Sequence, residues 1–493
     1  MRADLHRLLM KVSFPAMAFA LSAGWICPTD ANAQTEAAAL PSQSEPGFAT
    51  GLFAPSRSNL LLDMGGLRTV LGNFGITLQI QDINETLGNV SGGIQRGEGY
   101  EGLTTVTIGL DTQKAFGIPG GAFNLSVLNI RGSGVNWSTN NLANLQTASG
   151  ILATPTTRLW EVWYQQSFDD GAFDVKLGQQ SLDQEFIASQ GSALFLNTMM
   201  GWPMVPSADL YAGGPAYPLS SLGVRLRAQP GGGFTVLGGV FDDNPPGGPF
   251  DDDSQLLGST RWGGNFNLRT GALVIAEVQY ALNQPSPGDM DYGGHAAGLP
   301  GTYKLGFWYD TAAFPSPRID AGGVSLASPD TNGIPLMRRN NFSIYAVVDQ
   351  MVWRPSEDSP RALGVFARLM GAPGDRNLIS FSVNAGVTLK APLPGRDDDT
   401  LGIGFGVAKV SNAQRGFDAD FAALQCVPGT TCPIQSSETF LELTYQIQVA
   451  PWWQIQPDFQ FVFNPGGGLQ NPSNPTTKIG NEAVFGIRST VTF

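Results

Sequence analysis

Apolar and polar residues alternate along most of the chain. In its last segment Ala483, Phe485 and Ile487 share one face, whereas Arg488 and Thr490 lie on the other. A period of two is the pattern of a β-strand with one apolar and one polar side. A single strand of this kind also suits the edge of a soluble sheet. Many such strands, each about ten residues long and separated by turn residues, are instead typical of a transmembrane β-barrel.

The alternation predicts seventeen strands between residue 75 and the end of the chain. Single-chain bacterial barrels have an even number of strands, so one assignment must be wrong. Either two pieces merge to give sixteen, which we favour, or residues 312–340 contain another strand and the number is eighteen. We therefore predict an all-β fold, a transmembrane antiparallel barrel of sixteen strands over residues 75–493. The predicted strands span residues 75–86, 103–112, 121–131, 157–168, 171–181, 219–229, 233–241, 261–269, 271–282, 302–311, 341–353, 361–370, 377–389, 400–410, 438–449, 453–463 and 482–493.

A secretory signal peptide is predicted for residues 1–33. Arg2, Arg7 and Lys11 precede an apolar run that ends near Ile26, and a small-x-small cleavage site closes the segment. That run is too short for a transmembrane helix, and the rest of the chain has no uninterrupted apolar stretch of about 18 residues. We therefore expect an exported protein without a membrane-spanning helix.

Two short segments are predicted between the signal peptide and the barrel. Residues 34–58 are rich in Ala, Pro and Ser and show no periodicity, which is typical of a periplasmic linker. Residues 59–74 have apolar positions at helical spacing, with Asn59 as a possible N-cap. We expect a short helix there, lying against the periplasmic mouth of the barrel.

Loop lengths predict the orientation of the barrel, because periplasmic turns are short and external loops are long. Tight Gly-containing turns are predicted at residues 169–171 and 230–233. The long connection 182–218 lies between them and must be external. Counted after the external loops 87–102 and 132–156, it is the third. A loop of this length either covers the mouth or folds inside and narrows the lumen.

The composition excludes several other function classes. With 28 basic and 41 acidic residues the net charge is −13, so nucleic acid is not an expected partner. After the signal peptide the only histidine is His295, in a Gly-rich segment. A Ser/His hydrolase or a zinc enzyme would have to rely on this single histidine, so neither class is expected. We expect no enzymatic activity, no metal and no cofactor. In an oxidising compartment Cys426 and Cys432 favour a small disulfide loop, with metal ligation as the weaker alternative.

Side chains that face the lumen would select what passes, and strand phase supplies five candidates. Arg225 and Arg227 alternate with apolar residues and are expected to point inward, as is Lys176 on the preceding strand. Glu161 is assigned to the lumen because this direction brings it near Lys176. Arg131 follows a slip in the alternation, so its direction depends on a bulge. Such donors and acceptors can hydrogen-bond sugar hydroxyls, although simple solvation of a wide lumen is the alternative for each residue.

Four motifs follow one another along the chain, and together they span nearly all of the expected mature protein. They are GLR at 66–68, GPAYPL at 214–219 with GVR at 223–225, ALVIAEVQY at 272–280, and PWWQIQPDFQFVFNPG at 451–466. These motifs resemble those of the OprB-type carbohydrate-selective porins of bacterial outer membranes. One departure is Met64, where family members usually carry tryptophan, and it concerns the N-terminal helix rather than the pore.

The resemblance implies a sixteen-stranded barrel whose third external loop folds inward to form a charged constriction with arginine and glutamate. It also implies facilitated diffusion of glucose and similar sugars across the outer membrane. Arg225 is carried over because it ends a matching motif, whereas Glu161, Lys176 and Arg131 rest on strand phase alone. Expected partners are permeating sugars, outer-membrane lipid, and the barrel-assembly machinery, which would read the C-terminal strand ending at Phe493.

Two alternatives use the same barrel. A channel for other small solutes, such as polyols or organic or aromatic acids, cannot be separated from a sugar channel by lumen charge alone. A structural barrel or an adhesin is also compatible with the alternation, although its lumen would more often be blocked. A barrel of the TonB-dependent type would need an N-terminal plug and more strands than this length allows.

Overall fold

The computed structural model describes residues 57–250, 262–264, 266–283 and 298–493. The predicted signal peptide, nearly all of the predicted linker, and His295 lie outside the described residues. Within these ranges no helix is both long enough and apolar enough to cross a membrane.

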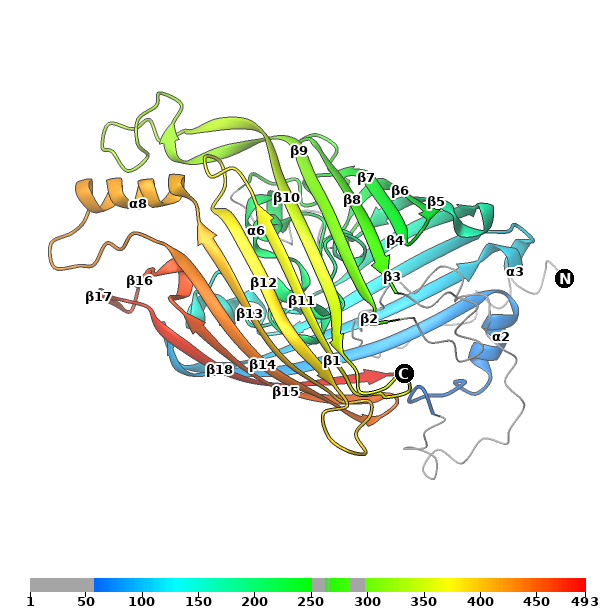
Figure 1. Cartoon of the computed structure of the whole chain (residues 1–493). Coiled ribbons are helices and arrows are strands. Elements are labelled where there is room, and N and C mark those ends of the chain that lie inside the picture. Colours follow the sequence, from blue (N-terminus) through cyan, green and yellow to red (C-terminus); the bar gives the residue numbers. More distant parts are fainter. Residues whose placement is uncertain (1–56, 251–261, 265, 284–297) are drawn as a thin grey trace, which may run out of the picture.

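Sixteen antiparallel strands close into a barrel (Figure 1). Closure joins the first strand to the last, because β1 pairs with both β2 and β18. Each of the sixteen barrel strands is thereby paired on both sides, as sheet structure within a bilayer requires. The barrel strands are β1 (Ile76–Gly93), β2 (Gly97–Asp111), β3 (Gly121–Gly132), β4 (Thr156–Phe168), β5 (Phe173–Gln180), β6 (Ser221–Gly231), β7 (Phe234–Asp242), β8 (Ala272–Leu282), β9 (Gly301–Asp320), β10 (Pro335–Trp353), β11 (Ala362–Gly371), β12 (Ile379–Lys390), β13 (Thr400–Val410), β14 (Ser437–Ala450), β15 (Trp453–Phe463) and β18 (Gly480–Thr492).

The strand prediction was wrong at one segment. Residues 261–269 were expected to form a strand, but their described residues belong to the connection between β7 and β8. Their apolar residues alternate, yet Trp262, Phe266 and Leu268 are 60%, 48% and 66% exposed, and none of the described residues of this segment belongs to a strand. Residues 312–340 add no further barrel strand, since they lengthen β9 and β10 instead. The number of strands is therefore sixteen.

The first external loop is much shorter than predicted. Residues 87–102 were expected to form this loop, but β1 runs to Gly93 and β2 begins at Gly97. The extra strand residues are mostly glycine and polar residues, so they lack the apolar row on which the alternation test depends. At this end of β1 and β2 the backbone pairing therefore continues past the residues whose apolar–polar alternation predicts a strand.

The N-terminal helix is also shorter than predicted. Residues 59–74 were expected to be helical, but helix α2 spans Leu67–Asn73, and two glycines with positive φ precede it. Asn59 does not cap this helix, and its side chain accepts a hydrogen bond from Arg68 at 2.9 Å. Arg68 also donates to the carbonyl oxygen of Phe493. Helix α2 and the C-terminus therefore lie at the same end of the barrel, the end with the short turns (Figure 1).

The remaining helices lie in the connections. At the opposite end of the barrel, α8 and a small hairpin of two short strands project beyond the wall (Figure 1). This is the end with the long loops, which we take as external. The elements are α3 (Thr112–Phe116), α4 (Val135–Trp137), α5 (Thr198–Gly201), α6 (Met204–Asp209), α8 (Asn412–Leu424), β16 (Gln470–Asn471) and β17 (Asn474–Lys478).

The burial pattern of the barrel is inverted relative to a soluble protein. On β6, Val224 and Leu226 are 42% and 47% exposed on the outer face, whereas Arg225 between them is buried. The largest hydrophobic core lies inside the barrel, where residues of the connection between β5 and β6, such as Phe186 and Met199, pack against the wall. An apolar outer face suits lipid, and the inner core shows that a loop occupies part of the lumen.

Candidate functional site

Two external loops fold into the barrel. We call the connection between β3 and β4, residues 133–155, loop 2, and the connection between β5 and β6, residues 181–220, loop 3. The loops hydrogen-bond to each other, from the Gly150 nitrogen to the Leu196 oxygen at 2.7 Å and from the Thr198 nitrogen to the Thr147 oxygen at 3.0 Å. Of the two arrangements left open for the third loop, the structure shows the inward one.

Carboxylates of the inner wall hold both loops by their backbone. Each accepts a hydrogen bond from a loop N–H, and charge-assisted bonds of this kind are strong when water is excluded. The acceptors lie on strands that are far from the loops in sequence. These hydrogen bonds therefore tie the loops to distant parts of the wall across the lumen. The bonds join Gln146 to Glu438 at 2.7 Å, Ile187 to Glu277 at 2.9 Å, Gly191 to Asp349 at 2.8 Å and Leu196 to Glu442 at 2.5 Å.

Arg368 on β11 is the matching donor. Its side chain is almost fully buried and donates to three consecutive loop 3 carbonyl oxygens, those of Met199, Met200 and Gly201, at 2.6–2.7 Å. A planar guanidinium with five N–H donors suits such a row of acceptors. The sequence analysis did not single out Arg368, although its place between Ala367 and Leu369 in a predicted strand would have pointed it inward.

Four of the five predicted pore residues lie on the inner wall beside loop 3. Lys176 on β5 pairs in register with Arg225 on β6, and both form ion pairs with Glu185 at the start of loop 3. Arg225 and Arg227 share a second carboxylate, Asp174. We call these five residues the inner ion cluster. The fourth predicted residue, Glu161 on β4, accepts a hydrogen bond from the backbone of Ser181 at 2.9 Å, also at the start of loop 3.

The inner ion cluster fixes loop 3 and is largely shielded from solvent. The side chains of Arg225, Asp174 and Glu185 are 3%, 0% and 19% exposed. Burial would raise the pKa of the Glu185 carboxyl, but Lys176 and Arg225 outweigh it and lower this pKa from 4.5 to about 2. Glu185 is therefore ionised at neutral pH. This geometry makes Arg225 an anchor of loop 3 rather than an open docking point in the lumen.

Arg131 does not lie in the lumen. Ile130 and Leu128 on the same strand pack inside the barrel against loop 2, so Arg131 is on the opposite, outer face. The expected slip in the alternation is not at Arg131, because β2 and β3 pair without interruption up to Gly132. The irregularity lies on the other side of β3, where it pairs with β4 next to Ser126. The register therefore removes Arg131 from the candidate pore residues.

Beneath loop 3 the lumen holds a cavity of about 550 Å³. Gln190, Gly191 and Leu194 of loop 3 form its ceiling, and its walls come from the strand ends near the short turns. Most polar lining groups are side-chain amides and hydroxyls. They are Gln81, Gln350, Gln446, Gln454, Gln456, Thr302, Thr388, Thr400 and Thr490.

Three charged residues also line this cavity: Lys390, Asp349 and Arg488. Asp349 already holds loop 3, and Arg488 on the last strand forms an ion pair with Glu85 on β1. The alternation of the terminal strand had placed Arg488 on its polar face, so its direction could be inferred from the sequence. Its partner could not, because Glu85 lies at the other end of the barrel sequence.

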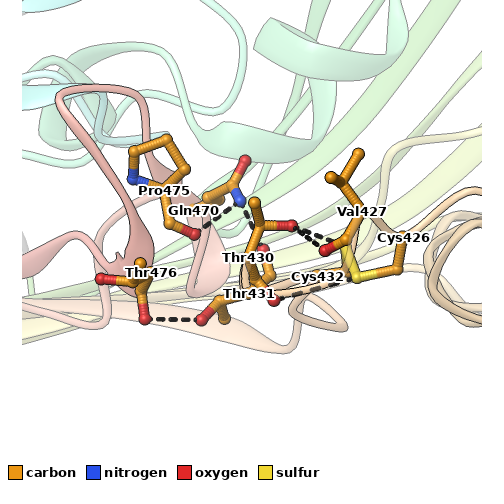
Figure 2. The surroundings of a disulfide bond; sticks show 8 residues. All are labelled: Cys426, Val427, Thr430, Thr431, Cys432, Gln470, Pro475 and Thr476. Carbon is orange, nitrogen blue, oxygen red and sulfur yellow. Dashed lines mark hydrogen bonds between the residues drawn. A yellow bond between two sulfur atoms is a disulfide. The ribbon is translucent and has the colours of Figure 1, made fainter.

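The two cysteines are joined by a disulfide bond in the external connection between β13 and β14 (Figure 2). The enclosed loop contacts the β16–β17 hairpin, since the Thr431 nitrogen donates to the Pro475 oxygen at 2.8 Å and Gln470 donates to the Thr431 oxygen at 2.6 Å. Cys426 and Cys432 thus lie in a link between two external loops, away from the cavity.

A closed barrel with an apolar outer face, inward-folded loops and a polar internal cavity defines a transmembrane channel of the outer-membrane porin class. The chain belongs to the carbohydrate-selective porin family OprB, whose sequence profile matches residues 95–493. It is 25% identical over 464 residues to Porin B of Pseudomonas aeruginosa, covering 90% of this chain and 92% of that protein. The chain is therefore a channel of the bacterial outer membrane and not an enzyme.

Solved structures agree on the fold. The high-pH structure of Pseudomonas putida OprB matches with a TM-score of 0.73 at 22% identity, covering 88% of this chain and 98% of the other. The low-pH structure of the same protein gives a TM-score of 0.52 at 18% identity, covering 90% of this chain and 100% of the other. At these identities the likeness concerns the barrel architecture alone.

Proposed function

We propose that this porin passes neutral sugars of monosaccharide size, glucose among them, by passive diffusion through a lumen narrowed by loop 3. The observation that carries the proposal is the cavity of about 550 Å³ beneath loop 3, whose polar lining consists mainly of amides and hydroxyls. Each amide can both donate and accept, as can each sugar hydroxyl. A solute that replaces wall-bound water with such contacts loses little hydrogen bonding on entry.

The charged residues have a different task in this proposal. The inner ion cluster and Glu161 hold the start of loop 3, and the wall carboxylates with Arg368 hold its middle. Arg488 and Lys390 are the cationic groups that a solute meets in the cavity itself. Selection then depends on the rigid position of loop 3 and on the neutral lining, with two cations adding a contact for hydroxyl or acidic groups.

The expected partners outside the lumen stay proposals. The exposed Val, Leu, Ile and Phe residues of the outer face suit contact with lipid acyl chains. Phe493 follows the last barrel strand, and its nitrogen donates to the Ile80 oxygen at 2.8 Å, so it lies at the seam where the barrel closes. A signal for barrel assembly at this position remains a prediction.

Liposome swelling with the purified protein tests the proposal. The panel compares glucose with sucrose, with the similarly sized anion gluconate, and with neutral amino acids. We expect glucose to enter fastest, several-fold ahead of sucrose and gluconate. Equal entry of sugars and amino acids would overturn sugar selectivity. Faster entry of gluconate would favour the alternative, a channel for organic acids.

The narrowing by loop 3 has its own test in the same assay. Arg368→Leu removes the donor to three buried loop carbonyls, so loop 3 should loosen and the ratio of sucrose to glucose entry should rise several-fold. Arg368→Lys keeps a charge but lacks the planar fork, and an intermediate ratio is expected. An unchanged ratio in both folded variants would contradict a size limit set by loop 3.

A further inference from the structure

Two carboxylates lie inside the barrel near its external end, where the connection between β7 and β8 begins. Asp243 directly follows β7, and Asp310 lies on β9. Phe241 and Trp308 of the same two strands belong to the hydrophobic core inside the barrel, so alternation directs Asp243 and Asp310 inward as well. Both residues are 0% exposed. We call Asp243 and Asp310 the buried carboxylate pair.

The two carboxylates lie beside the same tyrosine of loop 3, Tyr211. The Tyr211 hydroxyl donates to the Ala313 oxygen of β9 at 2.6 Å, and its ring packs against Phe314 with 5.3 Å between the ring centroids. Burial, and then the charges of Asp243 and Asp310, raise the pKa of this hydroxyl to about 12. Among the described residues, Asp243 is also the charged one that acts most strongly on the Asp310 carboxyl. The two carboxylates are therefore close enough to interact.

Most oxygens of the buried carboxylate pair have no hydrogen-bond donor. Both side-chain oxygens of Asp243 and the Oδ2 of Asp310 are buried without a partner, whereas the Oδ1 of Asp310 accepts a hydrogen bond from the Ala312 nitrogen at 2.8 Å. Burial raises the pKa of the Asp243 carboxyl to about 6, and the backbone N–H groups nearby offset only part of this rise. Asp243 is therefore mainly ionised at neutral pH, as a buried carboxylate without a donor.

Such a charge requires a counterion. A buried ionised carboxylate is strongly unfavourable unless a cation or hydrogen-bond donors compensate it. Among the described residues no lysine or arginine forms an ion pair with Asp243 or Asp310. The rings of Tyr211, Phe250 and Phe314 pack against one another beside the pair, so this side supplies apolar surface rather than donors. The compensating charge must come from a bound species.

The backbone next to Asp243 is held in place by side-chain hydrogen bonds. The Asn244 side chain donates to the Thr270 hydroxyl at 3.1 Å, and Asn267 donates to the Asn244 carbonyl oxygen at 3.1 Å. These bonds join the beginning of the β7–β8 connection to its end. Asp243 is thereby presented from a fixed segment, which is what a preorganised binding site requires.

We propose that the buried carboxylate pair binds a calcium ion, which joins the β7–β8 connection to the inner wall. Asp243 offers two free oxygens, which suits bidentate binding, and Asp310 offers a third. In the described ranges no group of three or more Asp, Glu, His or Cys side chains is arranged to hold a metal ion. Backbone carbonyl oxygens and water therefore complete the shell of about six to eight oxygens that Ca²⁺ takes in flexible geometry. Mg²⁺ requires a near-ideal octahedron and suits such a shell less well.

Thermal unfolding of the purified protein in detergent tests the site. After divalent cations are removed with EDTA, Ca²⁺ at about 1 mM should raise the unfolding temperature by several degrees, because extracellular calcium sites bind in about this range. Mg²⁺ at the same concentration should have a clearly smaller effect. Asp243→Asn/Asp310→Asn removes both charges and should abolish the Ca²⁺ shift. Without Ca²⁺ this variant should unfold no earlier than the wild type, since it no longer buries an unpaired charge.

A matched variant controls for calcium bound elsewhere, for instance by co-purified lipid. Asp397→Asn/Asp398→Asn changes two exposed aspartates at the opposite end of the barrel and should keep the full Ca²⁺ shift. Binding itself is measured by Tb³⁺ luminescence, which aromatic rings beside the ion, such as that of Tyr211, excite by energy transfer. The Tb³⁺ emission should fall several-fold on addition of Ca²⁺, and it should be equally weak in Asp243→Asn/Asp310→Asn.

Two results would overturn the proposal. One is a wild-type unfolding temperature that does not respond to Ca²⁺, which would leave protons as the compensating charge. The other is a Ca²⁺ shift of equal size in wild type and in Asp243→Asn/Asp310→Asn, with heat-modifiable migration on gels showing that the variant is folded. Asp243→Asn alone removes the residue with two free oxygens and should reduce the shift several-fold, so it provides the same test if the double variant does not fold.

Discussion

Two arginine–aspartate pairs on neighbouring parts of the wall have the same chemistry and opposite surroundings. Arg225 and Asp174 lie on the inner face, where their side chains are 3% and 0% exposed. Arg131 and Asp82 lie on the outer face, where their side chains are 26% and 12% exposed. The inner pair has a third partner from outside the wall, Glu185 of loop 3, whereas the partners of the outer pair all lie on β1 to β3.

The difference shows what an ion pair can do on each side of a barrel. Inside, the pair is enclosed by a loop of the same chain, and the free energy of the contact fixes that loop. Outside, the same pair faces lipid acyl chains, which offer no hydrogen bonds, and the partners that the structure shows for it lie on β1 to β3 of the wall itself. The side of the wall, rather than the residue types, therefore separates a pair that anchors a loop from a pair that joins neighbouring strands.

Removing the inner arginine should have the largest effect. Arg225→Leu leaves the fully buried Asp174 with Arg227 alone and takes one of two cations from Glu185, so the free energy of unfolding should fall by about 3–5 kcal/mol. The start of loop 3 should also shift, raising sucrose entry relative to glucose. Denaturant titration in detergent and liposome swelling measure the two effects. A folded variant with unchanged stability would contradict the assignment of Arg225 as an anchor.

The inner ion cluster should also respond to acid in a defined range. Glu185→Gln should reduce stability by about 2 kcal/mol at pH 7. Because the pKa of Glu185 falls from 4.5 to about 2 on folding, its contribution is present in full above pH 4.5 and is lost as the pH falls toward 2. The difference in unfolding temperature between wild type and variant should therefore vanish only below pH 4.5. A difference that vanishes between pH 7 and pH 5 would be incompatible with this depressed pKa.

The outer pair should contribute least to the stability of a single barrel. Asp82→Leu/Arg131→Leu replaces the ion pair by two apolar side chains that are compatible with lipid. The free energy of unfolding should therefore change by no more than about 1 kcal/mol, and it can increase. The matched inner variant, Asp174→Leu/Arg225→Leu, removes partners of Glu185 and Arg227 and should be clearly destabilised. Unfolding titrations of the two double variants show whether the inner and outer pairs contribute differently to the free energy of unfolding. Equal losses of this free energy in both variants would contradict the distinction between the two faces.

The strand prediction succeeded where each strand has a lipid-facing row. Leu222, Val224 and Leu226 alternate with Arg225 and its neighbours, which indicates that Arg225 points into the lumen. No information about the adjacent strands is needed for this prediction. It failed at residues 261–269, where apolar residues alternate without a pairing strand, and at the ends of β1 and β2, where strands extend without an apolar row. Periodicity reports the environment of a side chain, and backbone pairing can begin or end independently of it.

The candidate site was less accessible to sequence reasoning. Arg368, Glu438 and Glu442 hold the loops, yet each looks like an ordinary polar residue of a lumen-facing row. Their loop partners lie more than a hundred residues away along the chain, as Gln146 does from Glu438. Only the inward path of loops 2 and 3 brings these groups together, and no local pattern records that path.

The sequence by itself determined the barrel, the approximate places of its strands, and the polar side of most of them, because alternation between lipid and lumen acts on one strand at a time. The tertiary structure decided which side of the wall Arg131 occupies, which groups hold loop 3, and where the cavity remains open. These depend on the register between strands and on contacts between distant segments. A shift of one residue in register sends an arginine to the opposite face, so the same residue type becomes a loop anchor inside the barrel or a link between neighbouring strands on its outer face.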